Sequence, residues 1–186
     1  MMYEETCNIP FILRHPGGPK GVVSESLVSH LDIIPTMLDI AGIEQPEILT
    51  GKSLLPVLAD PKASVRDYAM VNFHRFAVNF DAIGGFYPIR CLTDGRYKLI
   101  INLFETDELY DLQVDPYEMN NVIHDPTYCE IRDKLHDRLL DWMDEIRDPF
   151  RSFAWGRRQW REACPEYYGE ETGNRPRPRG FPFQAA

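Results

Sequence analysis

An Asp-Gly pair between two strand-like runs is the feature that most restricts how this chain can fold. Residues 89–93 and 97–101 each have the two-residue period of a strand, and Asp94-Gly95 lies between them. A type I′ turn needs positive φ at both of its central residues, which Asp and Gly tolerate. The pattern therefore predicts a β-hairpin that turns at Asp94-Gly95.

Two further strands are expected around this hairpin. One is a short strand over residues 108–112, after a turn at residues 105–107, and the other lies at about residues 66–73. The aromatic segment 76–87 contains two adjacent glycines and is expected to be a loop. Together these elements predict a sheet of about four antiparallel strands.

Two helix starts are predicted after the last strand. Asp115-Pro116, with Glu118 shortly after, is typical of an N-cap, a proline in the first turn and a capping-box acid. A long helix is expected over residues 126–147, ended by Asp148-Pro149. Its apolar side chains recur at helical spacing: Tyr128, Ile131, Leu135, Leu139, Met143 and Ile146. This face would cover the sheet, because each element has one apolar face to bury.

The first 60 residues read as the last strand and helix of an α/β layer. Residues 8–13 are nearly all apolar, which is typical of a strand buried on both faces of a parallel sheet, although Pro10 disfavours full pairing. A short helix is expected from Asp32 as N-cap to Gly42 as the C′ stop. Its predicted buried face consists of Ile33, Ile34, Met37, Leu38 and Ala41. The expected fold class is α/β, and α+β within this fragment.

Composition indicates a soluble globular protein with no membrane partner. Of the 186 residues, 44% are hydrophobic and 26% are charged, and no apolar run is long enough to cross a bilayer. The acidic start does not resemble a signal peptide, and the sequence does not indicate the cellular compartment of the protein. The four cysteines form no C-x-x-C pair, which disfavours zinc-ribbon and thioredoxin chemistry.

Charge is distributed unevenly along the chain. The net charge is −9, and residues 149–186 contain seven arginines and four glutamates (+3), which leaves −12 for residues 1–148. The acidic body disfavours nucleic acid as a partner. The arginine- and proline-rich tail could bind a polyanionic glycan, but packing onto the acidic body is the plainer expectation. The arginines in question are Arg157, Arg158, Arg161, Arg175, Arg177 and Arg179.

Several sequence blocks resemble the sulfatase family, in the family's order. Residues 95–100 read GRYKLI and residues 108–121 read ELYDLQVDPYEMNN, which are similar to a signature of the family's C-terminal subdomain. Upstream, residues 29–42 (SHLDIIPTMLDIAG) and 51–56 (GKSLLP) resemble two segments that precede this signature. Residues 87–90 (YPIR) most resemble the branch typified by N-sulfoglucosamine sulfohydrolase.

The resemblance implies three parts within this chain. Residues 1–60 would be the C-terminal end of an alkaline-phosphatase-like α/β catalytic domain. Residues 61–148 would be the antiparallel C-terminal subdomain with its helix. Residues 149–186 would be a tail rich in arginine, proline and aromatic residues.

The chemistry of sulfatases is not visible in this sequence. The family hydrolyses sulfate esters or sulfamates with a formylglycine made from the cysteine or serine of a C-x-P-x-R motif, beside a calcium ion. Cys7, Cys91, Cys129 and Cys164 all lie outside such a motif. The resemblance therefore assigns no catalytic and no metal-binding residue here. Formylglycine and calcium, or another divalent metal, are expected in the full-length parent.

Three positions are candidates for substrate contact. His74 and Arg75 precede the aromatic loop, which often faces the substrate in the family; a structural histidine and a surface arginine are the alternative. Arg90 could bind sulfate or carboxylate in a bidentate way, or form a salt bridge with a carboxylate such as Asp111. Lys98 lies in mid-strand and is expected to be solvated or paired rather than bound to ligand.

The favoured function is that of the C-terminal part of a sulfatase, which supplies scaffold and a rim of the substrate cleft and is inactive alone. The expected partners are the N-terminal catalytic part of the same protein and a sulfated small molecule or glycan, with a homo-oligomer left open. The nearest alternative is a phosphonate or phosphodiester hydrolase of the same superfamily. A stand-alone, non-catalytic binding or assembly module is the alternative of another class. Gly51-Lys52-Ser53 is not read as a phosphate loop, because Pro46 stands where that motif needs glycine.

Overall fold

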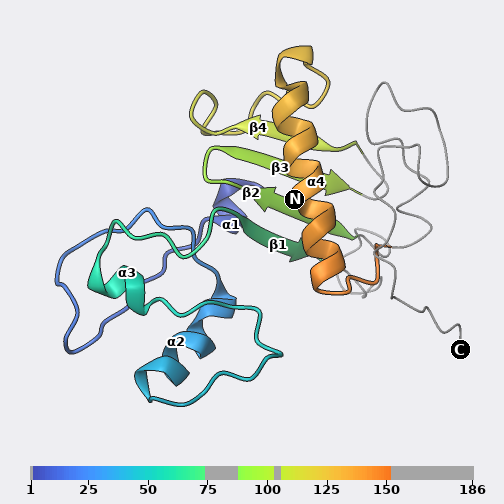
Figure 1. The fold of residues 1–186 in the computed structure, drawn as a ribbon. Helices are drawn as coiled ribbons and strands as arrows, with labels where there is room; N and C mark the ends of the chain where they lie inside the picture. Colours follow the sequence, from blue (N-terminus) through green and yellow to red (C-terminus); the bar gives the residue numbers. More distant parts are fainter. Residues whose placement is uncertain (1, 74–87, 103–105, 152–186) are drawn as a thin grey trace, which may run out of the picture. The chain divides into compact units, whose positions relative to one another are not determined.

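The computed structural model describes residues 2–73, 88–102 and 106–151 (Figure 1). These residues form two compact units. One comprises the residues up to 71 together with 93–96, and the other comprises the described residues between 72 and 92 and those from 97 on.

A four-stranded antiparallel sheet confirms the sheet predicted from the sequence (Figure 1). Its strands lie in chain order: β1 (Ala69–Phe73), β2 (Ile89–Thr93), β3 (Tyr97–Asn102) and β4 (Glu108–Asp111). Strands β3 and β4 pair with Leu99 opposite Leu109, and both leucines are fully buried. The β3–β4 side of the sheet therefore contributes directly to the core.

The loop of the β2–β3 hairpin differs from the predicted type I′ turn. Gly95 has a φ of 92°, but Asp94 is not among the described residues with positive φ. The Asp94 carboxylate instead accepts a hydrogen bond from Arg96 N–H at 3.0 Å. This contact suits a loop of three residues in which one glycine supplies the left-handed conformation.

The predicted long helix is present as a 3₁₀ turn, η2 (Pro126–Tyr128), followed by α4 (Cys129–Glu145). Asp125 caps the turn by accepting hydrogen bonds from Thr127, and these bonds lower the pKa of Asp125. Helix α4 covers one face of the sheet (Figure 1). It buries one stripe completely: Leu135, Leu139, Leu140 and Met143. Burial of each such side chain is worth about 1.5–3 kcal/mol, so this stripe is a main source of stability.

Helix α4 ends slightly earlier than predicted, through a backbone turn. Arg147 has a left-handed φ of 56° and donates its N–H to Asp144 O. Asp148 N–H bonds to Met143 O at 2.8 Å. This Schellman arrangement satisfies the last carbonyl groups and ends the helix before Pro149 is reached.

The helix start predicted at Asp115-Pro116 is wrong. The chain from residue 112 to 120 forms turns, and Glu118 has a left-handed φ of 53°. Asp115 does accept a backbone hydrogen bond, but from Asn120 N–H at 2.7 Å. The local capping signal is overridden because a tertiary ion pair with Lys98 fixes Glu118.

The first unit consists of short helices joined by extended segments. They are α1 (Glu4–Cys7), η1 (His30–Asp32), α2 (Ile33–Ile40) and α3 (Leu55–Ala59). The predicted helix ends as expected at Gly42, whose φ is 68°. Asp32 is the N-cap residue of this helix, as predicted, but its side chain makes no capping hydrogen bond to α2. Ser29 is the N-cap of the 3₁₀ turn that leads into the helix. Asp32 completes a capping box by accepting a hydrogen bond from Ser29 N–H at 2.7 Å.

Most of the face of α2 that was predicted to be buried is exposed, although Leu38 is half-buried. Ile33, Ile34 and Met37 are 37%, 51% and 60% exposed, while Pro35 and Thr36 are buried. Apolar periodicity identifies which face avoids water, but it does not identify what covers that face. The described residues of this unit leave it uncovered.

The strand predicted over residues 8–13 is absent from the part of the chain that the structure describes. This segment is irregular, and Ile12 is 93% exposed. A strand buried on both faces needs neighbouring strands at its edges and helices over its faces. No described strand pairs with this segment, so its apolar residues remain in contact with solvent.

Candidate functional site

Arg90 is the one predicted substrate-binding residue that lies within the described chain. It is 1% exposed on β2, and its guanidinium forms a bidentate ion pair with Asp148, with Nε at 2.5 Å from Oδ2 and Nη2 at 2.8 Å from Oδ1. Its Nη1 donates to Ile89 O at 2.9 Å, and the Phe150 ring lies 4.7 Å from the guanidinium carbon. The partner is Asp148 rather than the suggested Asp111. This buried arrangement favours the salt-bridge alternative over contact with substrate.

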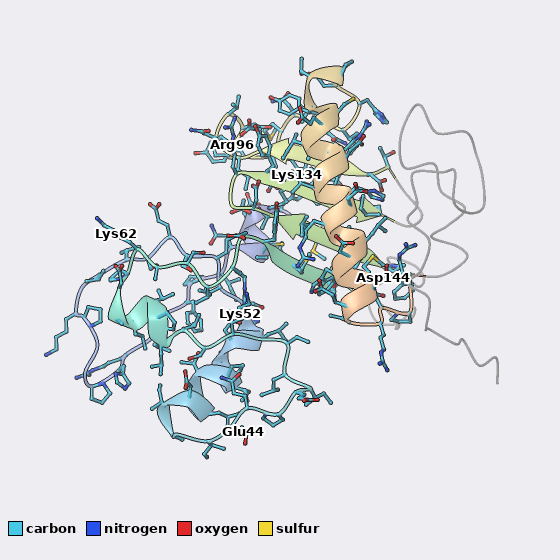
Figure 2. The ribbon with its side chains drawn as sticks, in the orientation of Figure 1. Glu44, Lys52, Lys62, Arg96, Lys134 and Asp144 are labelled. Atoms are coloured by element: carbon cyan, nitrogen blue, oxygen red, sulfur yellow. The ribbon has the colours of Figure 1, made fainter. Side chains whose placement is uncertain are left out.

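The Arg90–Asp148 pair also holds the chain that follows α4. Asp148 Oδ1 accepts a hydrogen bond from Phe150 N–H at 2.9 Å. Arg151 lies 3.3 Å from Asp144, near the end of α4 (Figure 2). Residues 148–151 are thereby fixed to the start of β2 and to the last turn of α4, so the point from which the tail departs has a defined place in the second unit.

Lys98 is paired, which confirms one of its two expected environments. Its Nζ lies 2.8 Å from Glu118 Oε1, and both side chains are 1% exposed. The alternative, a solvated lysine, is wrong. The pair joins the two halves of the signature, because Lys98 belongs to GRYKLI and Glu118 to the segment that follows β4. The left-handed turn at Glu118 allows this carboxylate to reach the sheet.

In the first unit, the buried Asp32 side chain connects the two upstream segments that resemble the family, residues 29–42 and 51–56. Its carboxylate is fully buried and accepts hydrogen bonds from Ser29 N–H at 2.7 Å and from Lys52 N–H at 2.8 Å. It also forms an ion pair with Arg66. Lys52 lies close to α2 (Figure 2), and its own ammonium donates to Val65 O at 2.9 Å.

Thr36 and Gly51 complete the same junction. The Thr36 hydroxyl donates to Asp32 O at 2.6 Å and accepts from Leu54 N–H at 2.9 Å. Asp32 and Thr36 therefore hold Lys52 and Leu54, two alternate residues of the GKSLLP segment just before α3. Gly51 approaches so closely that an added Cβ would lie 1.9 Å from Leu31 O. Only glycine fits at this crossing.

The remaining predicted positions are not part of a described site. His74, Arg75 and the six tail arginines from Arg157 on lie outside the described residues. Within residues 2–73, 88–102 and 106–151, no group of three or more His, Cys, Asp or Glu side chains could hold a metal ion. Among the helices that the structure describes, none has the length and apolarity needed to cross a membrane.

Sequence reasoning missed most of the residues that make these contacts. Asp32 was predicted only as a helix N-cap, Glu118 as part of a helix start, and Asp148 as a helix stop. Ser29 followed three residues later by Asp32 is a capping-box pattern that could have been recognised. The long-range partners have no local signal, because Lys98–Glu118 and Arg90–Asp148 are 20 and 58 residues apart.

Comparison with known proteins places this arrangement in a family. Residues 1–145 match the family model described as N-sulphoglucosamine sulphohydrolase, C-terminal. The uncharacterized sulfatase YidJ of Escherichia coli K12 is 46% identical over 179 residues, which cover 96% of this chain and 34% of that protein. Human N-sulphoglucosamine sulphohydrolase is 30% identical, over 76% of this chain and 37% of its own length.

Solved structures share the fold of the described part. The phosphonate monoester hydrolase SpPMH of Silicibacter pomeroyi superimposes with a TM-score of 0.61 at 26% identity, over 73% of this chain and 29% of that chain. The chain spans about a third of the length of the first curated relatives that it matches. On the family match and this similarity, the chain belongs to the sulfatases of the alkaline phosphatase superfamily, in the branch of the N-sulphoglucosamine sulphohydrolase C-terminal region.

Proposed function

We propose that this chain is the C-terminal part of a sulfatase, and that it supplies scaffold and a rim of the substrate cleft. The observation that carries this proposal is that charged residues of the family signature form ion pairs within the chain. Asp32, Lys98 and Glu118 are buried and engaged in internal ion pairs, so their charges serve to hold segments of the chain together. The formylglycine and the divalent metal then belong to a part of the parent outside these residues.

The exposed apolar side chains of α2 support the proposal that another part of the same protein packs against this helix. Ile34, Met37 and Ile40 of α2 are 51%, 60% and 47% exposed, and Leu31 of the preceding turn η1 is 56% exposed. Clusters of exposed apolar side chains of this kind mark surfaces that another polypeptide covers. The curated relatives contain about twice as much further sequence as this chain spans. The covering partner is the catalytic part of the parent.

Substrate contact in this proposal falls to His74 and Arg75. They follow β1 directly, and rigid elements that carry loops are common positions for binding residues. Arg90 stays a third proposed substrate contact. Its ion pair with Asp148 gives it a structural role as well, because it fixes the chain after α4 to β2. The substrate class is a sulfated small molecule or glycan.

A phosphonate or phosphodiester hydrolase is the second candidate. The similarity to SpPMH favours it, because this neighbour has a TM-score of 0.61 and acts, by its name, on phosphonate monoesters. Sulfatases and phosphonate hydrolases share a need for an activated nucleophile beside a divalent cation. The shared C-terminal fold does not separate the two reactions.

The complete gene product is the material that tests these two candidates. It is assayed with an aryl sulfate, an aryl phosphonate monoester and an aryl phosphodiester, before and after metal removal with EDTA. We expect hydrolysis of the sulfate ester to be fastest and to be lost with the metal. A kcat/KM for the phosphonate that exceeds the value for the sulfate would replace the first candidate by the second, and no hydrolysis of any ester would contradict both.

A further inference from the structure

Strand β4 lies at one edge of the sheet, so the backbone groups on its outer side need partners other than a fifth strand. The N–H and C=O groups of Leu109 both point outward. The N–H donates to Asn121 Oδ1 at 3.0 Å, and the C=O accepts from Val122 N–H at 2.9 Å. The chain at residues 121–122 therefore runs beside this edge.

The side-chain amide of Asn121 makes the hydrogen bonds to this edge that a neighbouring strand would otherwise make. Its Oδ1 accepts hydrogen bonds from Leu109 N–H and Ile123 N–H, both at 3.0 Å, and its Nδ2 donates to Asp107 O at 3.0 Å. Outward-facing groups on one edge of a strand are two residues apart, as Asp107 and Leu109 are. A side-chain amide offers an acceptor and a donor, as a peptide group does.

We propose that the Asn121 side chain closes the β4 edge against pairing with a further strand, including β4 of a second copy of this chain. An open edge presents unpaired N–H and C=O groups that template such association. The 115–120 turn holds Asn121 in position, because Asp115 accepts a hydrogen bond from Asn120 N–H at 2.7 Å. This role concerns association and is separate from the proposed hydrolase function.

The test compares three variants of the 186-residue chain with the unchanged protein. Asn121→Ala removes all three hydrogen bonds of the side-chain amide. We expect hydrogen exchange at the Leu109 amide to accelerate about fivefold or more, with increased self-association in sedimentation velocity. Asn121→Asp keeps an acceptor for Leu109 N–H and should keep that amide protected. Asn120→Ala is the matched control, since the Asn120 side-chain Nδ2 lies 3.5 Å from Asp115, in the turn rather than on β4.

Each outcome decides the matter. Unchanged exchange at Leu109 in Asn121→Ala would overturn the proposal, and so would faster exchange without any gain in association, because an open edge would then not pair. Acceleration of equal size in Asn120→Ala would assign the effect to the loop as a whole. If circular dichroism shows that Asn121→Ala does not fold, Asn121→Asp decides alone: a protected Leu109 amide supports the edge role, and an unprotected one overturns it.

Discussion

Gly51→Ala is expected to lower the free energy of unfolding of the first unit by about 3 kcal/mol or more. The new Cβ would lie 1.9 Å from Leu31 O and 2.4 Å from the Leu31 carbonyl carbon. Both are backbone atoms, which cannot rotate aside as the end of a side chain can. To relieve the clash, the segment that contains Gly51 would have to move away from Leu31. This movement would break the hydrogen bond from Lys52 N–H to Asp32.

Amide hydrogen exchange at Lys52 and Leu54 measures this effect directly, since these N–H groups bond to Asp32 and Thr36. We expect both amides to lose most of their protection in Gly51→Ala. Gly17→Ala is the matched control, because its Cβ would meet only the His15 ring at an ordinary 3.7 Å. Equal protection of Lys52 and Leu54 in the two variants would show that the close crossing at Gly51 does not hold the junction.

Lys98→Met is expected to lower the free energy of unfolding of the second unit by about 3–5 kcal/mol. The substitution keeps an apolar chain of similar length but removes the ammonium that lies 2.8 Å from the buried Glu118 carboxylate. Loss of this ion pair around a buried charge is the costly part, so Glu118→Gln should destabilise the unit to a comparable extent. The double variant, in which both charges are gone, should be more stable than the two single changes predict by addition.

Urea denaturation of the four proteins gives this cycle, and Lys134→Met is the matched control. Lys134 is an exposed lysine on α4 (Figure 2), so its replacement should change stability by less than about 0.5 kcal/mol. If Lys98→Met costs no more than Lys134→Met, or if the two effects of the cycle simply add, the ion pair does not hold the signature together.

Elements whose signals are local could be predicted from the sequence. The β2–β3 hairpin follows from alternation around one glycine, and α4 follows from a stripe of leucines at helical spacing. The end of α2 at Gly42 follows from the same kind of evidence. In each case the residues that decide the structure lie within one turn or one helix of each other.

The failures have a common physical cause, which is that tertiary contacts decide between local alternatives. The capping signal at Asp115 is genuine, but Glu118 leaves helical geometry to pair with Lys98. The apolar residues of α2 and of residues 8–13 were assigned to a core because of their polarity alone. Most of them are exposed in the described chain, since hydrophobicity does not specify the partner that covers an apolar surface.

The candidate site shows the same division. Arg90 was recognised as a residue suited to bidentate binding, and its guanidinium does bind the carboxylate of Asp148 in this way. Which carboxylate it would meet depends on where the end of α4 lies relative to β2, and no local pattern encodes that. Substrate contact by His74 and Arg75 stays a prediction, because both lie outside the described residues.

The central claim is that this chain supplies scaffold while the groups that break the sulfate ester belong to another part of the parent. The most direct measurement is hydrolysis of an aryl sulfate by the isolated 186-residue chain with calcium present, after circular dichroism has shown that the chain is folded. We expect no hydrolysis above the rate in buffer. Turnover that EDTA abolishes and added calcium restores would contradict the claim.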